Sequence, residues 1–201
     1  TVIIDGFVGV LWERFVRGLE DAFRARGIEA EWLPVTAALM AEDDVSALIA
    51  PFLGGDDPLF GRRCTLESRA LFDPTLLSAI RPKPGSRLSI IYGMGAALAS
   101  SGGLLLYVDV PKNDVQFRSR TGSVVNLAAR HPIPPKPMYK RMYFVDWPVL
   151  NRHRAELLAR IDIIVDAQRP DEPVFMQGPD FRSGLAAMAR NFVRVRPWFE
   201  P

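Results

Sequence analysis

The sequence predicts an α/β domain with three layers, in which helices cover both faces of a parallel sheet. Two stretches, residues 88–92 and 104–110, are continuous apolar runs, which are typical of strands buried on both faces. Segments with helical periodicity alternate with such strands along the chain, which favours a parallel layered sheet. The chain has 201 residues and 48% hydrophobic content, so it can bury one sizeable core. We therefore expect a single domain over residues 1–201.

A strand, a glycine turn and a helix open the chain. Residues 2–4 are an apolar run that ends at Asp5 and Gly6. Apolar side chains then recur every four residues, which predicts an amphipathic helix, and Gly27 stands where helices commonly end. These side chains are Leu11, Phe15, Leu19 and Phe23. A second strand is expected over residues 29–35.

The middle of the chain predicts three short helical segments. Asp43 and Asp44 can cap a helix. Asp73, followed by Pro74, is expected to cap a second one, because proline favours the first helical position. Residues 93–99, which connect the two buried strands, are long enough for one helical turn.

Beyond the second buried strand the pattern is less regular. We expect a helix over residues 113–120 and then a mobile or extended passage through the proline-rich residues 132–137. Asp146 is expected to cap the next helix, with Pro148 in its first turn. The last expected elements are a strand at 161–165, a helix at 179–191 and an edge strand at 192–196.

The composition excludes several classes of protein. The hydrophobic content excludes a disordered chain. The single cysteine, Cys64, cannot form an internal disulfide, and no apolar run approaches twenty residues, so we expect a cytoplasmic protein with no membrane partner. Aromatic residues are not interleaved with basic ones as in nucleic-acid readers, so we expect no nucleic-acid partner.

Charge is distributed unevenly along the chain. The net charge is only +2, but residues 1–80 carry −6 and residues 112–160 carry +7. The basic stretch is either a solvated face or part of an anion site. If it is a site, a small phosphorylated ligand is the expected partner.

The turn at residues 6–15 joins the first strand to the first helix. Backbone N–H groups of such a turn, together with the helix N-terminus, can hold an anion. A working phosphate loop of the P-loop type also needs a second glycine, a lysine and a hydroxyl at fixed offsets from Gly6. Those offsets fall on Leu11, Trp12 and Glu13. We therefore predict either a degenerate phosphate site or a turn whose glycines serve geometry alone.

The order of motifs resembles that of the uridine kinase and phosphoribulokinase group. The resemblance rests on the first turn, residues 72–77, the strand ending at residues 92–93 and the strand ending at Asp109. It implies a three-layer parallel sheet of the P-loop NTPase or kinase type with a degenerate P-loop. In that group an arginine-bearing lid follows the strand that ends in aspartate. The resemblance thus implies lid positions for Lys112, Arg118 and Arg120.

A narrower resemblance concerns two segments. Residues 139–151 and 192–201 resemble bacterial proteins labelled class I mannose-6-phosphate isomerase. The resemblance implies that this chain is a fragment preceding a downstream cupin domain in the same protein. The isomerase chemistry and its zinc would then belong to the cupin, and we expect no metal in this domain.

Histidine and cysteine are weaker candidates for chemistry. His131 and His153 are the only histidines, and their spacing is not that of a zinc site, so we expect a loop residue and a helix-face residue. Arg62 and Arg63 beside Cys64 favour a lowered pKa of its thiol, but no histidine is paired with it in the sequence.

We expect a domain that binds a phosphorylated sugar or nucleotide and that has no catalytic activity or only weak activity, without ATP and Mg²⁺ as cofactors. Its expected phosphate ligands are Gly6, Gly9, Lys112, Arg118, Arg120, Lys140 and Arg141. One alternative is an unconventional sugar or nucleoside kinase, whose candidate catalytic residues are Asp109, Arg118 and Arg120. Another is a docking domain without a ligand, which contacts its partner through Trp198 and Phe199.

Overall fold

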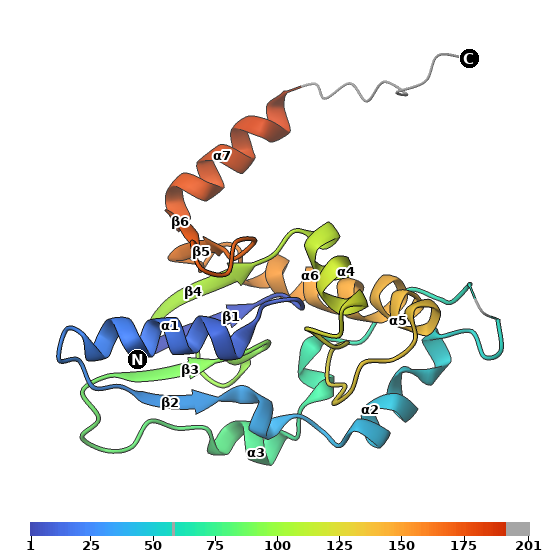
Figure 1. Cartoon of the computed structure of the whole chain (residues 1–201), viewed down its shortest axis with the longest axis horizontal. Helices are drawn as coiled ribbons and strands as arrows, with labels where there is room; N and C mark the ends of the chain where they lie inside the picture. The colour runs from blue at the N-terminus through green and yellow to red at the C-terminus, as the bar shows by residue number, and fades with distance from the viewer. Residues whose placement is uncertain (58, 192–201) are drawn as a thin grey trace.

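A single mixed sheet organises the chain, which confirms the α/β class. The computed structural model describes residues 1–57 and 59–191 (Figure 1). The strands are β1 (Val2–Gly6), β2 (Glu31–Pro34), β3 (Ser89–Tyr92), β4 (Leu104–Asp109), β5 (Ile163–Asp166) and β6 (Val174–Gln177). They lie in the order β2-β3-β1-β4-β5-β6, and all pairs are parallel except β5 with β6. The expected edge strand at 192–196 lies outside the described residues.

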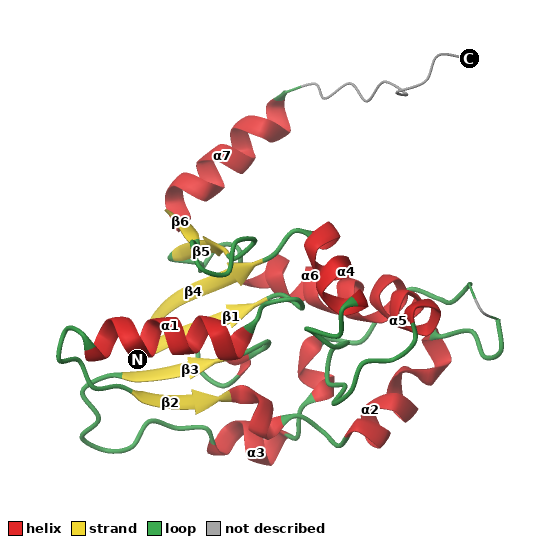
Figure 2. Cartoon of the chain, viewed as in Figure 1, coloured by secondary structure: helices red, strands yellow, loops and turns green. Residues whose placement is uncertain are grey.

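Seven α-helices lie between and after these strands in the described part of the chain. They are α1 (Trp12–Arg24), α2 (Glu42–Ile49), α3 (Pro74–Ala79), α4 (Lys112–Arg120), α5 (Pro135–Arg141), α6 (Trp147–Leu157) and α7 (Gly178–Arg190). Figure 2 shows α1 in front of the sheet, and α7 projecting from the edge that β6 forms. Among the described helices, none combines the length and the apolar character that crossing a membrane requires.

Helices cover both faces of the sheet around β1. Successive residues of a strand point to opposite faces. A Cβ at Gly6 would lie 3.0 Å from the ring of Trp12 in α1, whereas the side chain of Asp5 reaches His153 in α6. These helices therefore lie on opposite faces. Between them Ile3 of β1 and Tyr107 of β4 are fully buried.

Several predicted elements are confirmed. The 3₁₀ turn Ala96–Leu98 follows β3, and α4 and α7 fall where helices were expected. Asp73 caps α3, because its side chain accepts hydrogen bonds from the backbone N–H groups of Thr75 at 2.8 Å and Leu76 at 2.9 Å.

Two predicted helix caps are wrong. The residue before α2 is Ala41, so Asp43 and Asp44 lie inside the first turn, where their charge favours the helix dipole instead. Asp146 does stand directly before α6, with Pro148 in the first turn as expected, but its side chain makes no capping hydrogen bond. It ends the π-helical segment η5 (Met142–Asp146), which joins α5 to α6 without interruption, and its side chain is fully buried. Because the helical backbone continues through Asp146, the first N–H groups of α6 need no hydrogen bond from a capping side chain.

The expected extended passage at residues 132–137 is also wrong in its second half. Helix α5 begins at Pro135 and has prolines in its first turn. Proline is tolerated there because the first N–H groups of a helix have no partner within it. The same residues that suggested an irregular segment therefore begin a helix.

Candidate functional site

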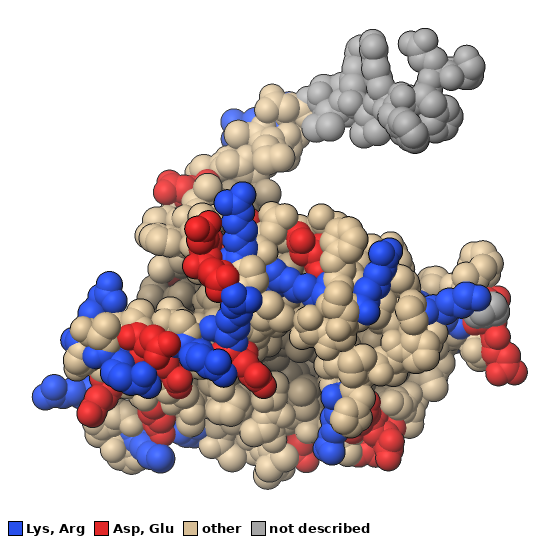
Figure 3. Space-filling view, viewed as in Figure 1, with Lys and Arg blue, Asp and Glu red and all other residues tan. Residues whose placement is uncertain are grey.

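A crevice of about 700 Å³ opens where the chain leaves β1. Residues 8–11 and the first turns of α1 form one wall, and residues 123–125 contribute to the other. Figure 3 shows this face hollowed beside the first turn of α1, with basic and acidic side chains at the rim. The chain leaves the neighbouring strands β1 and β4 toward opposite sides of the sheet. The crevice thus lies at a topological switch point, the place where α/β proteins bind ligands.

The lining of the crevice is mixed, with apolar residues beside three charged residues of α1. These charged residues are Glu13, Arg14 and Arg17, and all three are exposed. Arg14 forms an ion pair of 2.5 Å with Asp171, whereas among the described residues no carboxylate lies within ion-pair distance of Arg17. The crevice thus combines an apolar wall with a free cation.

Trp12 contributes an unused hydrogen-bond donor to this region. Its indole Nε1 is buried and has no acceptor among the described residues. A buried donor without a partner is costly, and such groups are commonly satisfied by water or by a ligand. Trp12 also lines the crevice.

The structure explains why glycine occupies both positions of the turn, Gly6 and Gly9. A Cβ at Gly6 would lie 2.7 Å from the carbonyl oxygen of Val108, so the strand β4 leaves no room for one. Gly9 has a φ of +102°, which disfavours other residues, and a Cβ there would lie 2.6 Å from Val115. The carbonyl oxygen of Gly9 accepts a hydrogen bond of 2.7 Å from Arg118. Packing therefore accounts for the glycines of this turn.

The structure does not bring the expected phosphate ligands together. Arg118 also donates to the carbonyl oxygens of Ala167 at 2.9 Å and Gln168 at 2.8 Å, so its guanidinium fastens the β1–α1 loop to the end of β5. Burial lowers the pKa of Arg118. Its contacts are those of a structural arginine.

The other expected cations lie on separate parts of α4 and α5. Lys112 lies over the ring of Trp147, with its ammonium 5.3 Å from the centroid. Arg120 donates to the hydroxyl of Tyr139, and Lys140 donates to the carbonyl oxygen of Asp57. Asp109, the strand-end acid, forms an ion pair of 2.5 Å with Arg154.

Arg141 belongs to a buried polar cluster. Its guanidinium donates to the carbonyl oxygen of Leu127 and lies 3.6 Å from a carboxylate oxygen of Asp146. The other oxygen of Asp146 accepts a hydrogen bond of 2.6 Å from Asn126. Burial raises the pKa of Asp146 to about 6, against the lowering effect of Arg141 and Asn126. This cluster holds α5 and the loop before it together.

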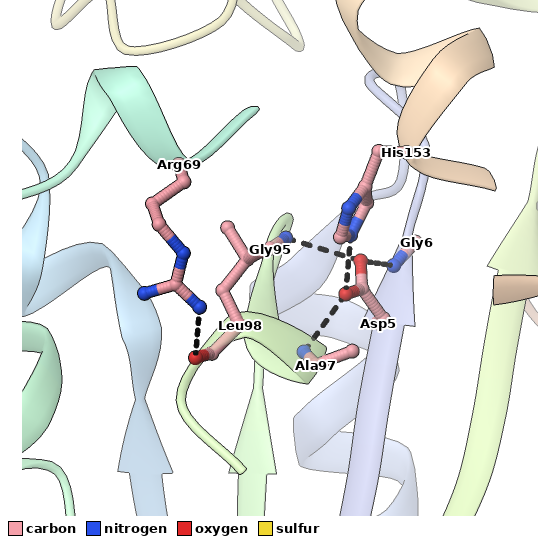
Figure 4. A network of polar contacts seen from close by, with 7 residues as sticks. All are labelled: Asp5, Gly6, Arg69, Gly95, Ala97, Leu98 and His153. Carbon is pink, nitrogen blue, oxygen red and sulfur yellow. Dashed lines mark hydrogen bonds and ion pairs between the residues drawn. The ribbon is translucent and has the colours of Figure 1, made fainter. Parts of the chain in front are cut away.

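A second buried network is centred on Asp5, at the end of β1 (Figure 4). The carboxylate is fully buried and accepts hydrogen bonds from the backbone N–H groups of Gly6 at 2.7 Å, Gly95 at 3.0 Å and Ala97 at 2.9 Å. Nε2 of His153 lies 2.8 Å from its Oδ2. The carboxylate of Asp5 is therefore held by groups from β1, the β3–β4 connection and α6.

The surroundings of His153 favour its charged form. Burial on its own would lower the pKa of His153, but the hydrogen bond and negative charge of Asp5, with a contribution from Glu156, raise the pKa above its ordinary value. Tyr107 lies opposite Asp5 on the neighbouring strand, and its buried hydroxyl has no partner among the described residues. Burial and the charges of Asp5 and Asp109 raise the pKa of Tyr107 well above its usual range.

The sequence predicted a helical position for His153 but not its pairing with Asp5. A signal was available in each segment. Asp5 is an acid that closes a buried apolar run, and His153 follows Leu150 by three residues, which places both on one face of a helix. Their pairing required the sheet topology.

Cys64 differs from the expectation for its thiol. It is fully buried, and burial raises the pKa of its thiol, although Arg152 acts in the opposite direction. The proposed lowering by its sequence neighbours Arg62 and Arg63 is therefore wrong, because desolvation outweighs the nearby positive charge.

The part of the chain that the structure describes contains no group of three or more His, Cys, Asp or Glu side chains arranged to hold a metal ion. A family model described as "Domain of unknown function (DUF8485)" matches residues 1–190. Comparison with curated proteins and with solved structures finds no match.

Proposed function

The chain belongs to the family described as Domain of unknown function (DUF8485), and we propose that it binds a sugar phosphate or a nucleotide in the crevice beside α1 without transferring phosphate. The observation that carries this proposal is the crevice of about 700 Å³ at the carboxyl end of β1. Its position at the switch point of a parallel sheet and at the start of a helix favours an anionic ligand.

The lining suits a ligand with an apolar ring and a charged group. The ring would lie against apolar residues such as Val10, Leu11 and Met94, while Arg17 would meet the phosphate at the rim. Arginine suits this role because its planar group donates to two phosphate oxygens at once.

We propose that the fold is of the P-loop kinase type with a degenerate loop. The strand, glycine turn and helix over residues 2–24 support this proposal, since a P-loop has the same order of elements. The residues Leu11, Trp12 and Glu13 supply neither the lysine nor the hydroxyl that phosphoryl transfer uses. The carbonyl contacts of Arg118 argue against its moving onto a phosphate as a lid residue, so the kinase alternative is the weaker one.

Calorimetric titration of the chain with ATP and Mg²⁺, uridine monophosphate and mannose 6-phosphate tests the binding. At least one of these is expected to bind, and free mannose is expected not to. Arg17→Ala should weaken binding about tenfold, the effect of losing one charged hydrogen-bonding partner. Arg24→Ala is the matched control, because Arg24 lies in the last turn of the same helix and pairs with Asp21.

A second variant tests the location without changing charge. Ser123→Trp places a large side chain at an exposed position of the crevice wall and should abolish the binding that Arg17→Ala weakens, while leaving the unfolding midpoint unchanged. Phosphorylation assays on a panel of sugars and nucleosides should show no turnover. Turnover that Arg118→Ala or Arg120→Ala abolishes would instead establish the kinase alternative.

We propose that this domain is the N-terminal module of a mannose-6-phosphate isomerase-like protein. The proposal rests on the resemblance of residues 139–151 and 192–201 to such proteins. The reading frame downstream of Pro201 tests it. A cupin domain with a zinc site there supports the proposal, and a stop codon contradicts it.

A further inference from the structure

A second cavity, of about 550 Å³, lies on the opposite face of the sheet from α1. The connection between β3 and β4, including residues 97–101, forms one wall, and α6 forms another. His153 lies in the lining, and its partner Asp5 belongs to the network of Figure 4. This cavity shares no lining residue with the crevice beside α1.

Three arginines from three separate segments converge on this wall. Arg69 lies in the 3₁₀ turn Ser68–Leu71, Arg81 follows α3, and Arg160 follows α6. Each lines the cavity and donates one hydrogen bond to the connection. The acceptors are the carbonyl oxygens of Leu98 at 3.2 Å, Ala99 at 3.1 Å and Ser101 at 3.1 Å respectively.

The positive charge of this cluster is not neutralised within the described residues. None of the three guanidinium groups has a carboxylate within ion-pair distance there. Among the residues that the structure describes, the lining contains one acid, Glu156, beside three arginines and His153. Like charges that converge on one short segment repel each other, so an anion that binds among them relieves that repulsion.

The arginines are also held in position before any ligand binds. Each uses one of its five N–H donors on a carbonyl oxygen and keeps the others. The connection that they contact is itself fixed, because Gly95 and Ala97 donate to the buried carboxylate of Asp5. A pre-organised set of guanidinium groups loses little conformational freedom on binding an anion.

We propose that this arginine cavity binds a phosphate group, either as inorganic phosphate or as a small phosphate monoester. Three guanidinium forks meet the three oxygens of a phosphate monoester, which a carboxylate cannot match. The cavity is larger than phosphate alone requires and falls in the usual range for small-molecule sites, so the monoester is the tighter ligand.

Titration calorimetry of the chain with inorganic phosphate and with glucose 6-phosphate tests the proposal. Both are expected to bind, the monoester more tightly, and each of Arg69→Gln, Arg81→Gln and Arg160→Gln should weaken binding about tenfold. Arg26→Gln is the matched control, because Arg26 is exposed and also donates to one carbonyl oxygen, that of Ala22 at 2.8 Å. Unfolding midpoints without ligand check that each variant is folded, and Arg81→Lys, which keeps the charge, should restore part of the affinity.

A further titration distinguishes binding in the arginine cavity from binding in the crevice beside α1. The titrations are repeated on Ser123→Trp, in which that crevice is blocked, and phosphate binding should persist. Loss of binding in Ser123→Trp, equal affinity in the arginine variants and in Arg26→Gln, or no binding of either compound to the unmodified chain would each overturn the proposal.

Discussion

Nε2 of His153 lies 2.8 Å from Oδ2 of Asp5, and the two side chains are 2% and 0% exposed. The pair joins α6 to the end of β1. Through Gly95 and Ala97 it also fixes the connection that leads to β4. It lies between the crevice, which begins just beyond Gly6, and the arginine cavity, which His153 lines.

Asp5→Asn should destabilise the domain strongly. The change leaves His153 without its charged partner and puts an amide next to three backbone N–H groups that need an acceptor. Removing one partner of a buried pair costs about 3–5 kcal/mol of the free energy of unfolding. Urea unfolding followed by circular dichroism measures it.

Asp56→Asn is the control for that substitution, because Asp56 is exposed. Its free energy of unfolding should equal that of the unmodified chain within about 0.5 kcal/mol. Equal stability of Asp5→Asn and Asp56→Asn would contradict a structural role for the buried pair.

The stabilising effect of His153 should decrease as the pH rises. The pKa of His153 is raised in the folded state, so its charge stabilises the fold fully below the ordinary pKa of histidine, and the effect is lost as the pH passes through the raised value. The charged groups that raise its pKa are Asp5 and Glu156. The difference in free energy of unfolding between the unmodified chain and His153→Gln should therefore be larger at pH 6 than at pH 9. A difference that does not change with pH would contradict a charged His153.

Asp146 should have a pH dependence in a lower range. Its pKa of about 6 in the fold lies above the ordinary value of 3.8, so the folded state binds an extra proton and stability falls as the pH rises between these two values. The fall amounts to roughly 3 kcal/mol. Asp146→Asn should remove this part of the pH dependence. Asp57 is an exposed contrast, because the N–H groups of Phe60 and Leu59 lower its pKa. Its ionisation therefore makes stability rise with pH, and Asp57→Asn should remove that rise.

Gly6→Ala should destabilise the fold by about 1–3 kcal/mol, because the added methyl group would overpack against the backbone of β4. Gly18→Ala provides the contrast. Gly18 lies on the exposed side of α1 with no atom within 4 Å of an added Cβ, so alanine there should raise stability by about 1 kcal/mol. Thermal unfolding of both variants checks the pair, and equal effects would contradict the close approach at Gly6.

Local patterns predicted the regular elements of the fold well. The period-four apolar residues predicted α1, and the buried runs predicted β3 and β4, because burial on one or two faces leaves a direct record in the sequence. Strand β6 was not predicted. Its four residues are exposed and show no alternation of apolar and polar side chains, so the pattern gives no signal there.

The candidate sites were only partly predictable. The turn after β1 was identified correctly as the start of a helix, since its glycines and the strand before it are local features. The expected cluster of cations was predicted wrongly, because its residues were grouped by their closeness in the sequence and not in space. Arg118 fastens backbone carbonyls, whereas Arg69 and Arg160, 91 positions apart, meet on one connection. Only the tertiary fold determines which cations converge.

The most direct test of the proposed function is the titration of mannose 6-phosphate and uridine monophosphate into the unmodified chain, Arg17→Ala and Arg24→Ala. A phosphorylated ligand is expected to bind, with an affinity that Arg17→Ala weakens about tenfold and Arg24→Ala leaves unchanged. Equal affinity in all three proteins, or no binding of any phosphorylated compound to the unmodified chain, would contradict it.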